Sequence, residues 1–231
     1  MLPKEFVEAI QRALEPHRDP EKAAPMAKYM RDHFPFLGLK RPEFQPLIRP
    51  LVVAAKPVAD EAWLAEAARL LWALPEREYH YTAIDLLAKY EKRLTPASLP
   101  LLCELIAMNA WWDSVDGVTG AILSPLTLRL PELKVSMNAW SRDENFWIRR
   151  AAILHQLKHH KATDTERLFD YCRANASDTE FFIRKAIGWA LRTYAYTDPL
   201  AVRTFVEANR AQLSALSVRE ALKHFEDLPG E

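Results

Sequence analysis

The stretch Phe146-Trp147-Ile148-Arg149-Arg150-Ala151 recurs thirty-five positions later as Phe181-Phe182-Ile183-Arg184-Lys185-Ala186. A further step reaches Val218-Arg219-Glu220-Ala221, and one step back reaches Trp111-Trp112-Asp113-Ser114-Val115-Asp116. The aromatic pair is kept in three of the four copies, and so is the pattern of an apolar residue, arginine, any residue and alanine. A period in the mid-thirties corresponds to two helices with their turns, which is typical of helical repeat arrays.

The composition also favours an all-α fold. The chain of 231 residues contains 5 glycines, whereas an average usage of about 7% would give roughly 16. All-β folds use glycine in positive-φ turns, and nucleotide-binding α/β folds use glycine-rich loops, so both classes are disfavoured. Because the TPR consensus is absent, we expect HEAT-like helix pairs stacked into a curved α-solenoid.

Helix-sized segments with a period of 3.6 lie between the prolines, among them segments 60–74 and 77–90. No Ser/Gly-rich linker or shift in composition marks a boundary, so we expect a single HEAT-like repeat domain over residues 1–231. Serine–x–x–glutamate patterns predict capping boxes before the later copies, at Ser141/Glu144, Ser177/Glu180 and Ser217/Glu220.

The cysteines and the hydropathy pattern bear on the cellular compartment. Cys103 and Cys172 show no CxxC or disulfide-rich spacing, which favours a reducing compartment. The N-terminal stretch has no apolar signal core, and no apolar run approaches the ~18 residues of a membrane span. We therefore expect a cytoplasmic protein that does not cross a membrane, with no obligate protein partner evident.

Asp116 occupies a position where the other copies of the repeat have Ala151, Ala186 and Ala221. A carboxylate at a helix-packing position is costly unless it is paired or lies in a solvated cleft. Trp112 lies one helical turn before Asp116. Trp189 stands four residues after Lys185, with Arg192 on the next turn. We expect these residues to line a groove, or alternatively the tryptophans to fill the core and Asp116 to pair with a structural arginine.

Basic residues concentrate locally although 31 Lys+Arg balance 31 Asp+Glu. The segment 145–161 carries Arg149, Arg150, Lys158 and Lys161 with no acid, and the segment 181–197 carries Arg184, Lys185 and Arg192 with no acid. Acids precede both helices, where they complement the helix dipole. A neutral chain can thus contain a basic stripe that contacts a phosphate backbone, or simply a solvated charged face.

Two weaker signals have structural interpretations. His155 and His159 are spaced i,i+4, as metal ligands on one helix face can be, but no third ligand stands nearby. We therefore expect no metal site, and without a glycine-rich loop we expect no cofactor. Gly188, inside an otherwise helical segment, indicates a close helix approach or a ligand contact.

Several stretches together resemble the bacterial AlkD-type DNA alkylation repair glycosylases, which are single-domain HEAT-like repeat enzymes. These stretches are LPEREY, WWDSVD, RRAAILHQLK, FFIRKAIGWALR and EKAAPMAKYMRDHFPFLG, and they extend over nearly the whole chain. The resemblance implies an active-site cleft of one aspartate, one arginine and two tryptophans. By motif, these are Asp116, Arg150, Trp112 and Trp189.

The resemblance also implies DNA contacts and a reaction. Tyr29, in the AKYM segment, is similar to a further cleft residue, and Arg192 is similar to a phosphate contact. Arg149 and Lys185 join these as expected DNA-binding residues. The implied substrate is double-stranded DNA with an N3- or N7-alkylated purine, whose positive charge already makes it a good leaving group. The expected enzyme is a monofunctional glycosylase that starts base excision repair and is nucleoid-associated while it acts on DNA.

This reaction gives each expected site residue a chemical role. Cleavage of the N-glycosidic bond develops oxocarbenium character, which Asp116 can stabilise while it positions water. Trp112 and Trp189 can add cation–π contacts of about 0.5–2 kcal/mol each, and Arg150 suits a phosphate or the orientation of Asp116. The alternative is a non-catalytic HEAT-like scaffold that binds protein or a DNA structure.

Overall fold

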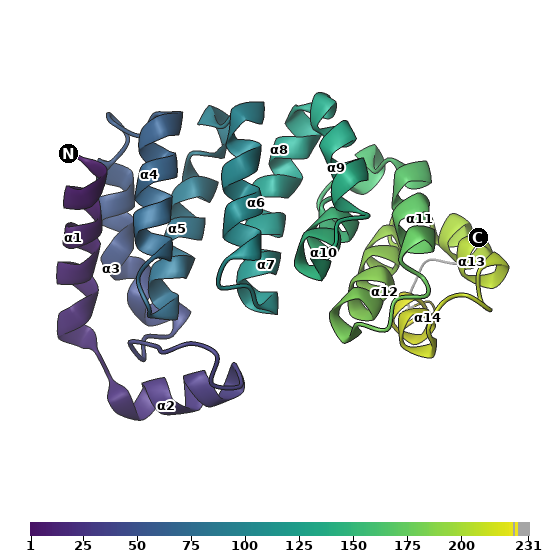
Figure 1. Ribbon diagram of the computed structural model, residues 1–231, viewed down its shortest axis with the longest axis horizontal. Helices are drawn as coiled ribbons and strands as arrows, with labels where there is room; N and C mark the ends of the chain where they lie inside the picture. Colours follow the sequence, from purple (N-terminus) through teal and green to yellow (C-terminus); the bar gives the residue numbers. More distant parts are fainter. Residues whose placement is uncertain (224, 226–231) are drawn as a thin grey trace. The chain divides into compact units, whose positions relative to one another are not determined.

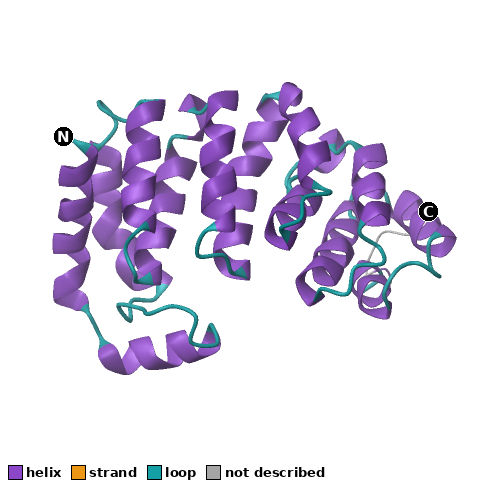
Figure 2. Cartoon of the chain, in the orientation of Figure 1, coloured by secondary structure: helices purple, strands orange, loops and turns teal. Residues whose placement is uncertain are grey.

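The computed structural model describes residues 1–223 and 225. Within this part of the chain the regular secondary structure is helical and no strand is present (Figure 2). The expected all-α fold class is thereby confirmed. Two compact units, Met1–Leu101 and Leu102–Glu231, divide the chain. A single functional domain over residues 1–231 stays a prediction.

The first unit contains five α-helices, of which four form its core. Helix α1 packs on α3 and α4, and α5 packs on the same two helices. Phe6, Ile10, Phe44, Leu64 and Leu87 are all fully or almost fully buried between them. The helices are α1 (Pro3–Leu14), α2 (Pro20–Tyr29), α3 (Arg41–Ala54), α4 (Glu61–Trp72) and α5 (Arg77–Lys89), with 3-10 turns at Glu15–His17, Glu91–Arg93 and Pro96–Ser98.

Helix α2 is attached to this unit through the loop that follows it. None of its own residues is buried, and Figure 1 shows it lying across the ends of the other helices of the unit. The buried Glu78 carboxylate of α5 accepts the backbone N–H groups of Leu37, Gly38 and Leu39 at 2.9, 3.0 and 3.0 Å. Leu37 O in turn accepts the N–H of Asp19, the N-cap of α2, at 2.8 Å.

The second unit is built from pairs of helices. Its helices are α6 (Leu99–Ala107, which begins in the first unit), α7 (Trp112–Val118), α8 (Ser124–Arg129), α9 (Lys134–Trp140), α10 (Phe146–Leu154), α11 (Thr165–Ala174), α12 (Phe181–Ala195), α13 (Pro199–Ala208) and α14 (Ala215–Ala221). A π-helical segment, Thr119–Leu123, joins α7 to α8, and 3-10 turns lie at Pro131–Leu133 and His160–Ala162.

The repeat identified in the sequence corresponds to a layer of equivalent helices. Helix α7 packs on α10, α10 on α12, and α12 on α14, whereas α9, α11 and α13 pack against the members of this layer. The repeated alanines Ala151, Ala186 and Ala221 are fully buried. These alanines therefore pack between successive helical repeats, as their register predicts.

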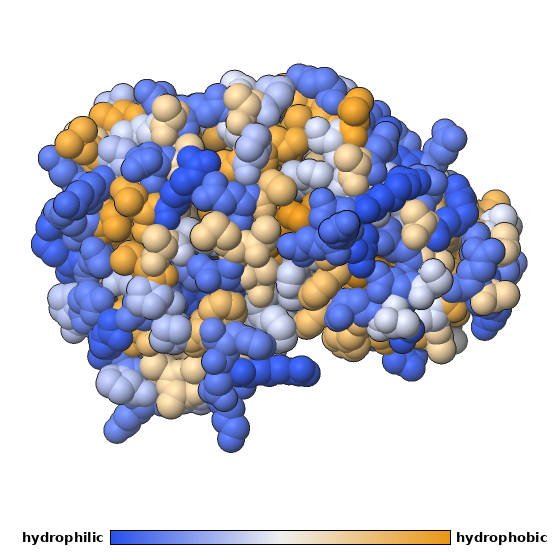
Figure 3. Space-filling model, in the orientation of Figure 1, coloured by the Kyte–Doolittle hydropathy of each residue, from blue (hydrophilic) through white to orange (hydrophobic). Residues whose placement is uncertain are grey.

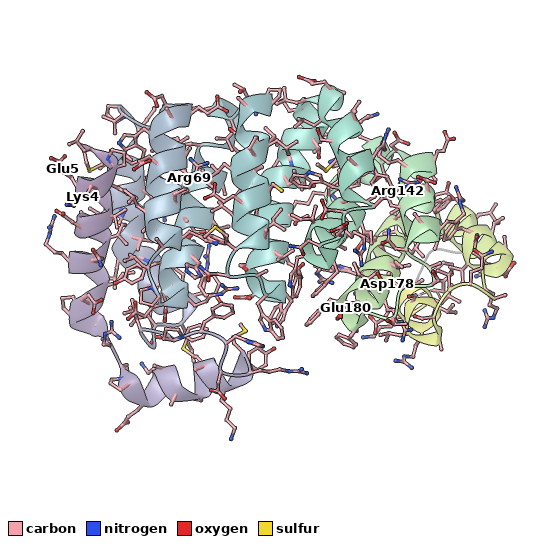
Figure 4. The ribbon with its side chains drawn as sticks, in the orientation of Figure 1. Lys4, Glu5, Arg69, Arg142, Asp178 and Glu180 are labelled. Atoms are coloured by element: carbon pink, nitrogen blue, oxygen red, sulfur yellow. The ribbon has the colours of Figure 1, made fainter. Side chains whose placement is uncertain are left out.

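The predicted capping boxes are wrong. The N-caps are Asn145, Glu180 and Ser214, whose side chains accept backbone N–H groups at the starts of α10, α12 and α14. An aspartate two residues before the cap shapes the loop in two copies. Asp143 Oδ1 accepts the N–H of Asn145, and Asp178 Oδ1 accepts that of Glu180, both at 2.8 Å. Figure 4 labels Asp178 and Glu180. The chain therefore enters α10 and α12 later than Ser141 and Ser177 indicate, and it enters α14 three residues earlier than Ser217 indicates.

The π-helical segment begins three residues after Asp116. Ser124 N–H bonds to Thr119 O, five residues earlier. The next residue, Pro125, has no backbone N–H and cannot donate the hydrogen bond that would continue the helix. The hydrogen-bonding pattern of the helix therefore changes just before this proline. Such single π turns are frequent at functional sites.

Among the described residues, no helix is long and apolar enough to cross a membrane. On the face drawn in Figure 3, hydrophilic side chains predominate and apolar ones form small groups between them. Val135, Phe181 and Leu200 are among the large apolar side chains that remain exposed.

Replacing Gly38 with alanine should destabilise the protein. Gly38 has φ +93°, and a Cβ there would lie 2.1 Å from Asp19 O and 3.0 Å from Ala23 N. Backbone strain and steric overlap should together cost about 1–3 kcal/mol of unfolding free energy, measured by chemical denaturation. Gly120→Ala is the matched control, because a Cβ at Gly120 meets nothing within 4 Å. Equal stability of the two variants would contradict this account.

Candidate active site

Asp116 and Arg150 form a bidentate ion pair between neighbouring repeats. Arg150 Nε donates to Asp116 Oδ1 at 2.8 Å, and Nη2 donates to Oδ2 at 2.7 Å. The third nitrogen, Nη1, donates to the backbone carbonyl of Phe182 at 2.6 Å. The side chains of Arg150 and Asp116 are 5% and 18% exposed. The pair thus connects α7, α10 and α12, and every nitrogen of the guanidinium has a protein acceptor.

The environment of Asp116 has opposing effects on its titration. Burial raises the pKa of Asp116 above its usual range, and the neighbouring Asp113 adds to that rise. The two hydrogen bonds and the charge of Arg150 lower the pKa of Asp116 and limit the increase. The bidentate pair accordingly offsets part of the cost of burying the Asp116 carboxylate.

A cluster of three aromatic rings includes the one ring that contacts this ion pair, that of Phe182. Trp111, Trp147 and Phe182 are in mutual contact, with ring centroids 6.0 Å apart for the two tryptophans, 5.2 Å for Trp111 and Phe182, and 4.8 Å for Trp147 and Phe182. The Arg150 Cζ atom is 5.9 Å from the centroid of Phe182. Rings that exclude water in this way strengthen the charge interaction beside them.

One face of α12 extends from the ion pair. Phe182, Lys185, Trp189 and Arg192 follow one another at i, i+3, i+7 and i+10, so they lie along one stripe of the helix. All four are half-buried, whereas Ala186, Ile187, Ala190 and Leu191 on the opposite side are buried. Trp189 lies about 10 Å along the helix axis from Phe182. Trp112, the first residue of α7, stands one turn before Asp116. Of the four predicted catalytic residues, Asp116 and Arg150 are thus in direct contact.

The predicted DNA-binding cations of this unit are all in ion pairs. Arg149 binds Asp178 at 2.7 Å, and its Nη1 also donates to the carbonyls of Asp143 and Glu144 at 2.6 and 3.0 Å. Lys185 and Arg192 share Glu220, at 3.0 and 2.8 Å. Four cations of the basic stripe predicted from the sequence therefore have carboxylate partners, namely Arg149, Arg150, Lys185 and Arg192.

Tyr29, the remaining predicted DNA contact, belongs to the first unit. It is the last residue of α2 and is 72% exposed.

A sequence model of the family described as "DNA alkylation repair enzyme" matches residues 10–225. The chain belongs to this family. A solved structure described as "Predicted DNA alkylation repair enzyme from Enterococcus faecalis" shares 33% identity, with a TM-score of 0.83 over 89% of this chain and 95% of that chain. No curated protein matches the sequence significantly. Family membership agrees with the resemblance seen in the motifs.

Two residues next to the family's cleft motif were missed by the sequence reasoning. Phe182 holds Arg150 through its carbonyl oxygen and its ring, contacts that a residue pattern does not encode. Glu220 bridges two expected DNA contacts, and a signal for it was available. It stands at the repeat position of Arg150 and Lys185 with the opposite charge.

His155 and His159 are buried side by side, with ring centroids 5.8 Å apart. His155 Nδ1 bonds to Ala152 O at 2.6 Å, and His159 Nε2 bonds to Ser124 O at 2.9 Å. Within the described residues, no group of three His, Cys, Asp or Glu could hold a metal ion. The histidine pair therefore has a structural explanation as hydrogen-bonding core residues.

Removing Arg150 should destabilise the protein more at neutral pH than in mild acid. Arg150→Met leaves Asp116 buried without its counter-charge, at a cost of about 3–5 kcal/mol. Its pKa then lies still further above the unfolded value, so protonation favours the folded state and the cost falls as the pH drops toward about 4. Arg142→Met is the control, because the Arg142–Asp170 pair is solvent-exposed and such pairs contribute about 0–1 kcal/mol. Equal losses for both variants, measured by denaturation across this pH range, would refute the prediction.

Acid should destabilise the wild type through His155. Burial lowers the pKa of His155 from 6.5 to about 3. Below pH 6.5, His155 becomes protonated in the unfolded chain but stays neutral in the folded protein. The free energy of unfolding therefore falls by up to about 1.4 kcal/mol per pH unit until the pH approaches 3. His155→Asn retains a donor for Ala152 O and should flatten this slope. Melting curves of both proteins between these pH values test it, and an unchanged slope would exclude His155 as the cause.

Proposed function

We propose that the protein is a monofunctional DNA glycosylase that hydrolyses the N-glycosidic bond of N3- or N7-alkylated purines in duplex DNA. The proposal rests mainly on the Asp116 carboxylate, which stands at the position of a packed alanine in a member of the DNA alkylation repair enzyme family and is bound by Arg150 through both of its oxygens. A cationic base leaves without protonation, so one carboxylate is enough for the reaction. The enzyme would work as a single domain in the cytoplasm, where it meets chromosomal DNA.

Asp116 acts on the charge that develops on the sugar. When the bond to the alkylated purine lengthens, positive charge moves onto the deoxyribose ring. A fixed carboxylate stabilises that charge without reorganising in the transition state, and its oxygens can also accept a proton of the attacking water. A partly water-excluded position strengthens this effect.

Arg150 serves as the positioning residue for Asp116. Its fork fixes both carboxylate oxygens, and its remaining nitrogen is tied to Phe182 O. An arginine bound in this way is better placed to orient Asp116 than to hold a flanking phosphate, the other role expected for it. The geometry thus favours one of the two roles that the sequence left open.

Trp112 and Trp189 are assigned to the cationic substrate. The ring faces can stabilise the alkylated purine and the oxocarbenium ion by about 0.5–2 kcal/mol each. Tyr29, Arg149, Lys185 and Arg192 are assigned to DNA binding, where each new phosphate contact adds to the salt dependence of affinity.

Asp116→Asn should reduce release of 7-methylguanine from alkylated duplex DNA at least about 100-fold, the scale on which removal of one preorganised electrostatic group acts. Base release under single-turnover conditions, with circular dichroism to verify the fold, measures this. Asp170→Asn removes the same charge from an exposed pair and should retain activity.

The same assay separates the alternatives. Base release that is undiminished in Asp116→Asn would remove the role of this carboxylate. Salt-dependent duplex binding by the wild type without abasic sites would instead identify a binder of DNA structure. Neither DNA binding nor base release would leave a scaffold for a protein partner.

A further inference from the structure

Glu220 of α14 joins two cations that stand on either side of Trp189. Its Oε1 is 3.0 Å from Lys185 Nζ, and its Oε2 is 2.8 Å from Arg192 Nη1. Lys185 and Arg192 are seven residues apart on α12, about 10 Å along its axis. Both side chains therefore converge on one carboxylate, which they hold ionised. Lys185, and with it Arg192, keeps the pKa of Glu220 below its usual range despite partial burial.

Gly188 allows Glu220 to reach this position. A Cβ at residue 188 would lie 2.5 Å from Glu220 Cβ and 2.9 Å from Ser217 O. Because Gly188 has no side chain, α14 can pack directly against the backbone of α12 at this point. This confirms the close helix approach expected at Gly188. Ser217 Oγ also donates to Arg184 O at 2.9 Å. Position 220 is consequently fixed by backbone packing as well as by its ion pairs.

This ion pair cluster is more accessible than the others on the repeated helices. Lys185 and Arg192 are 38% and 23% exposed, whereas Arg150 is nearly buried and Arg149 is also held by two carbonyl oxygens. The carboxylate between them is 15% exposed. Because both cations keep contact with water, their pairing with Glu220 is weaker than that of a fully buried pair, and an anion of higher charge can compete for them. Lys185 and Arg192 both bind the oxygens of one carboxylate. Two basic side chains arranged in this way can also bind the oxygens of a phosphate.

We propose that Lys185 and Arg192 form one phosphate site, that Glu220 is its resident anion, and that a DNA backbone phosphate replaces the carboxylate when duplex binds. The inference rests on the proposed function, because it requires that this face of α12 meets DNA. Glu220 then determines how tightly the protein holds undamaged duplex. Each DNA contact made by the two cations first costs their pairing with Glu220, which weakens the sequence-independent part of binding.

Glu220→Gln tests this directly. Glutamine keeps the length of the side chain and its Cβ on Gly188 but removes the charge that competes with phosphate. We expect about three- to tenfold tighter binding of undamaged duplex at low salt, and a steeper salt dependence of affinity by about 0.9 for each additional phosphate neutralised. Glu207→Gln, an exposed glutamate on α13, changes the net charge equally and should give at most a small increase.

Two further variants assign the gain to this site. The double variant Arg192→Gln/Glu220→Gln should lose most of the increase in duplex affinity that Glu220→Gln alone produces. Glu220→Asp keeps the charge and the contact with Gly188 but is one methylene too short to span both cations, so it should show a smaller gain. Thermal melting verifies that each variant is folded. If Glu220→Gln does not fold, the duplex affinity of Glu220→Asp is compared with that of the wild type instead.

An affinity of Glu220→Gln no higher than that of Glu207→Gln would overturn the inference, and so would a gain that persists without Arg192. Base release from alkylated duplex, measured on the same proteins, separates this inference from the proposed chemistry. Normal base release without a gain in binding contradicts only the phosphate site. A gain in binding without base release supports the phosphate site and contradicts only the glycosylase assignment.

Discussion

The candidate site depends on one buried ion pair between adjacent repeats. Asp116 breaks the alanine register of the packing layer, and Arg150 from the next repeat supplies the charge that makes this tolerable. The pair makes three hydrogen bonds that together connect α7, α10 and α12. A carboxylate fixed in this way does not reorganise when a positive charge appears beside it, which is what electrostatic catalysis requires. The same bonds make the site part of the fold, so stability and chemistry share residues here.

Charge balance is local in this protein as well as global. The 31 basic residues equal the 31 acidic ones, and on the repeated helices Arg149, Arg150, Lys185 and Arg192 each have a carboxylate partner. A net charge of zero therefore does not exclude DNA binding. It also does not mean that the basic side chains are unpaired. On such a surface, DNA phosphates would compete with the protein's own carboxylates for the basic side chains. This competition costs least at the more accessible ion pairs.

Much of the fold could be predicted because it follows local periodicity. The segments expected at 60–74 and 77–90 are helices α4 and α5, and the thirty-five-residue register places Ala151, Ala186 and Ala221 in the packing layer. The capping residues could not be predicted, because both a serine and the true cap satisfy the same local rule. The partners of Arg150 and Glu220 come from neighbouring helices, and helix rotation and spacing decide such contacts. Neither property appears in a pattern along one segment.

The π-helical turn at Thr119–Leu123 gives the helix that carries Asp116 one more residue than a continuous α-helix of the same length would need. The residues before the turn are therefore rotated by about 100° relative to those after it. The half that carries Asp116 faces Arg150, while the following half, α8, buries Ser124, Leu126 and Thr127. Removing a single residue from the turn would change the rotation between Asp116 and α8 by about 100°. The spacing between WWDSVD and Pro125 is thus under a constraint that residue identity alone does not express.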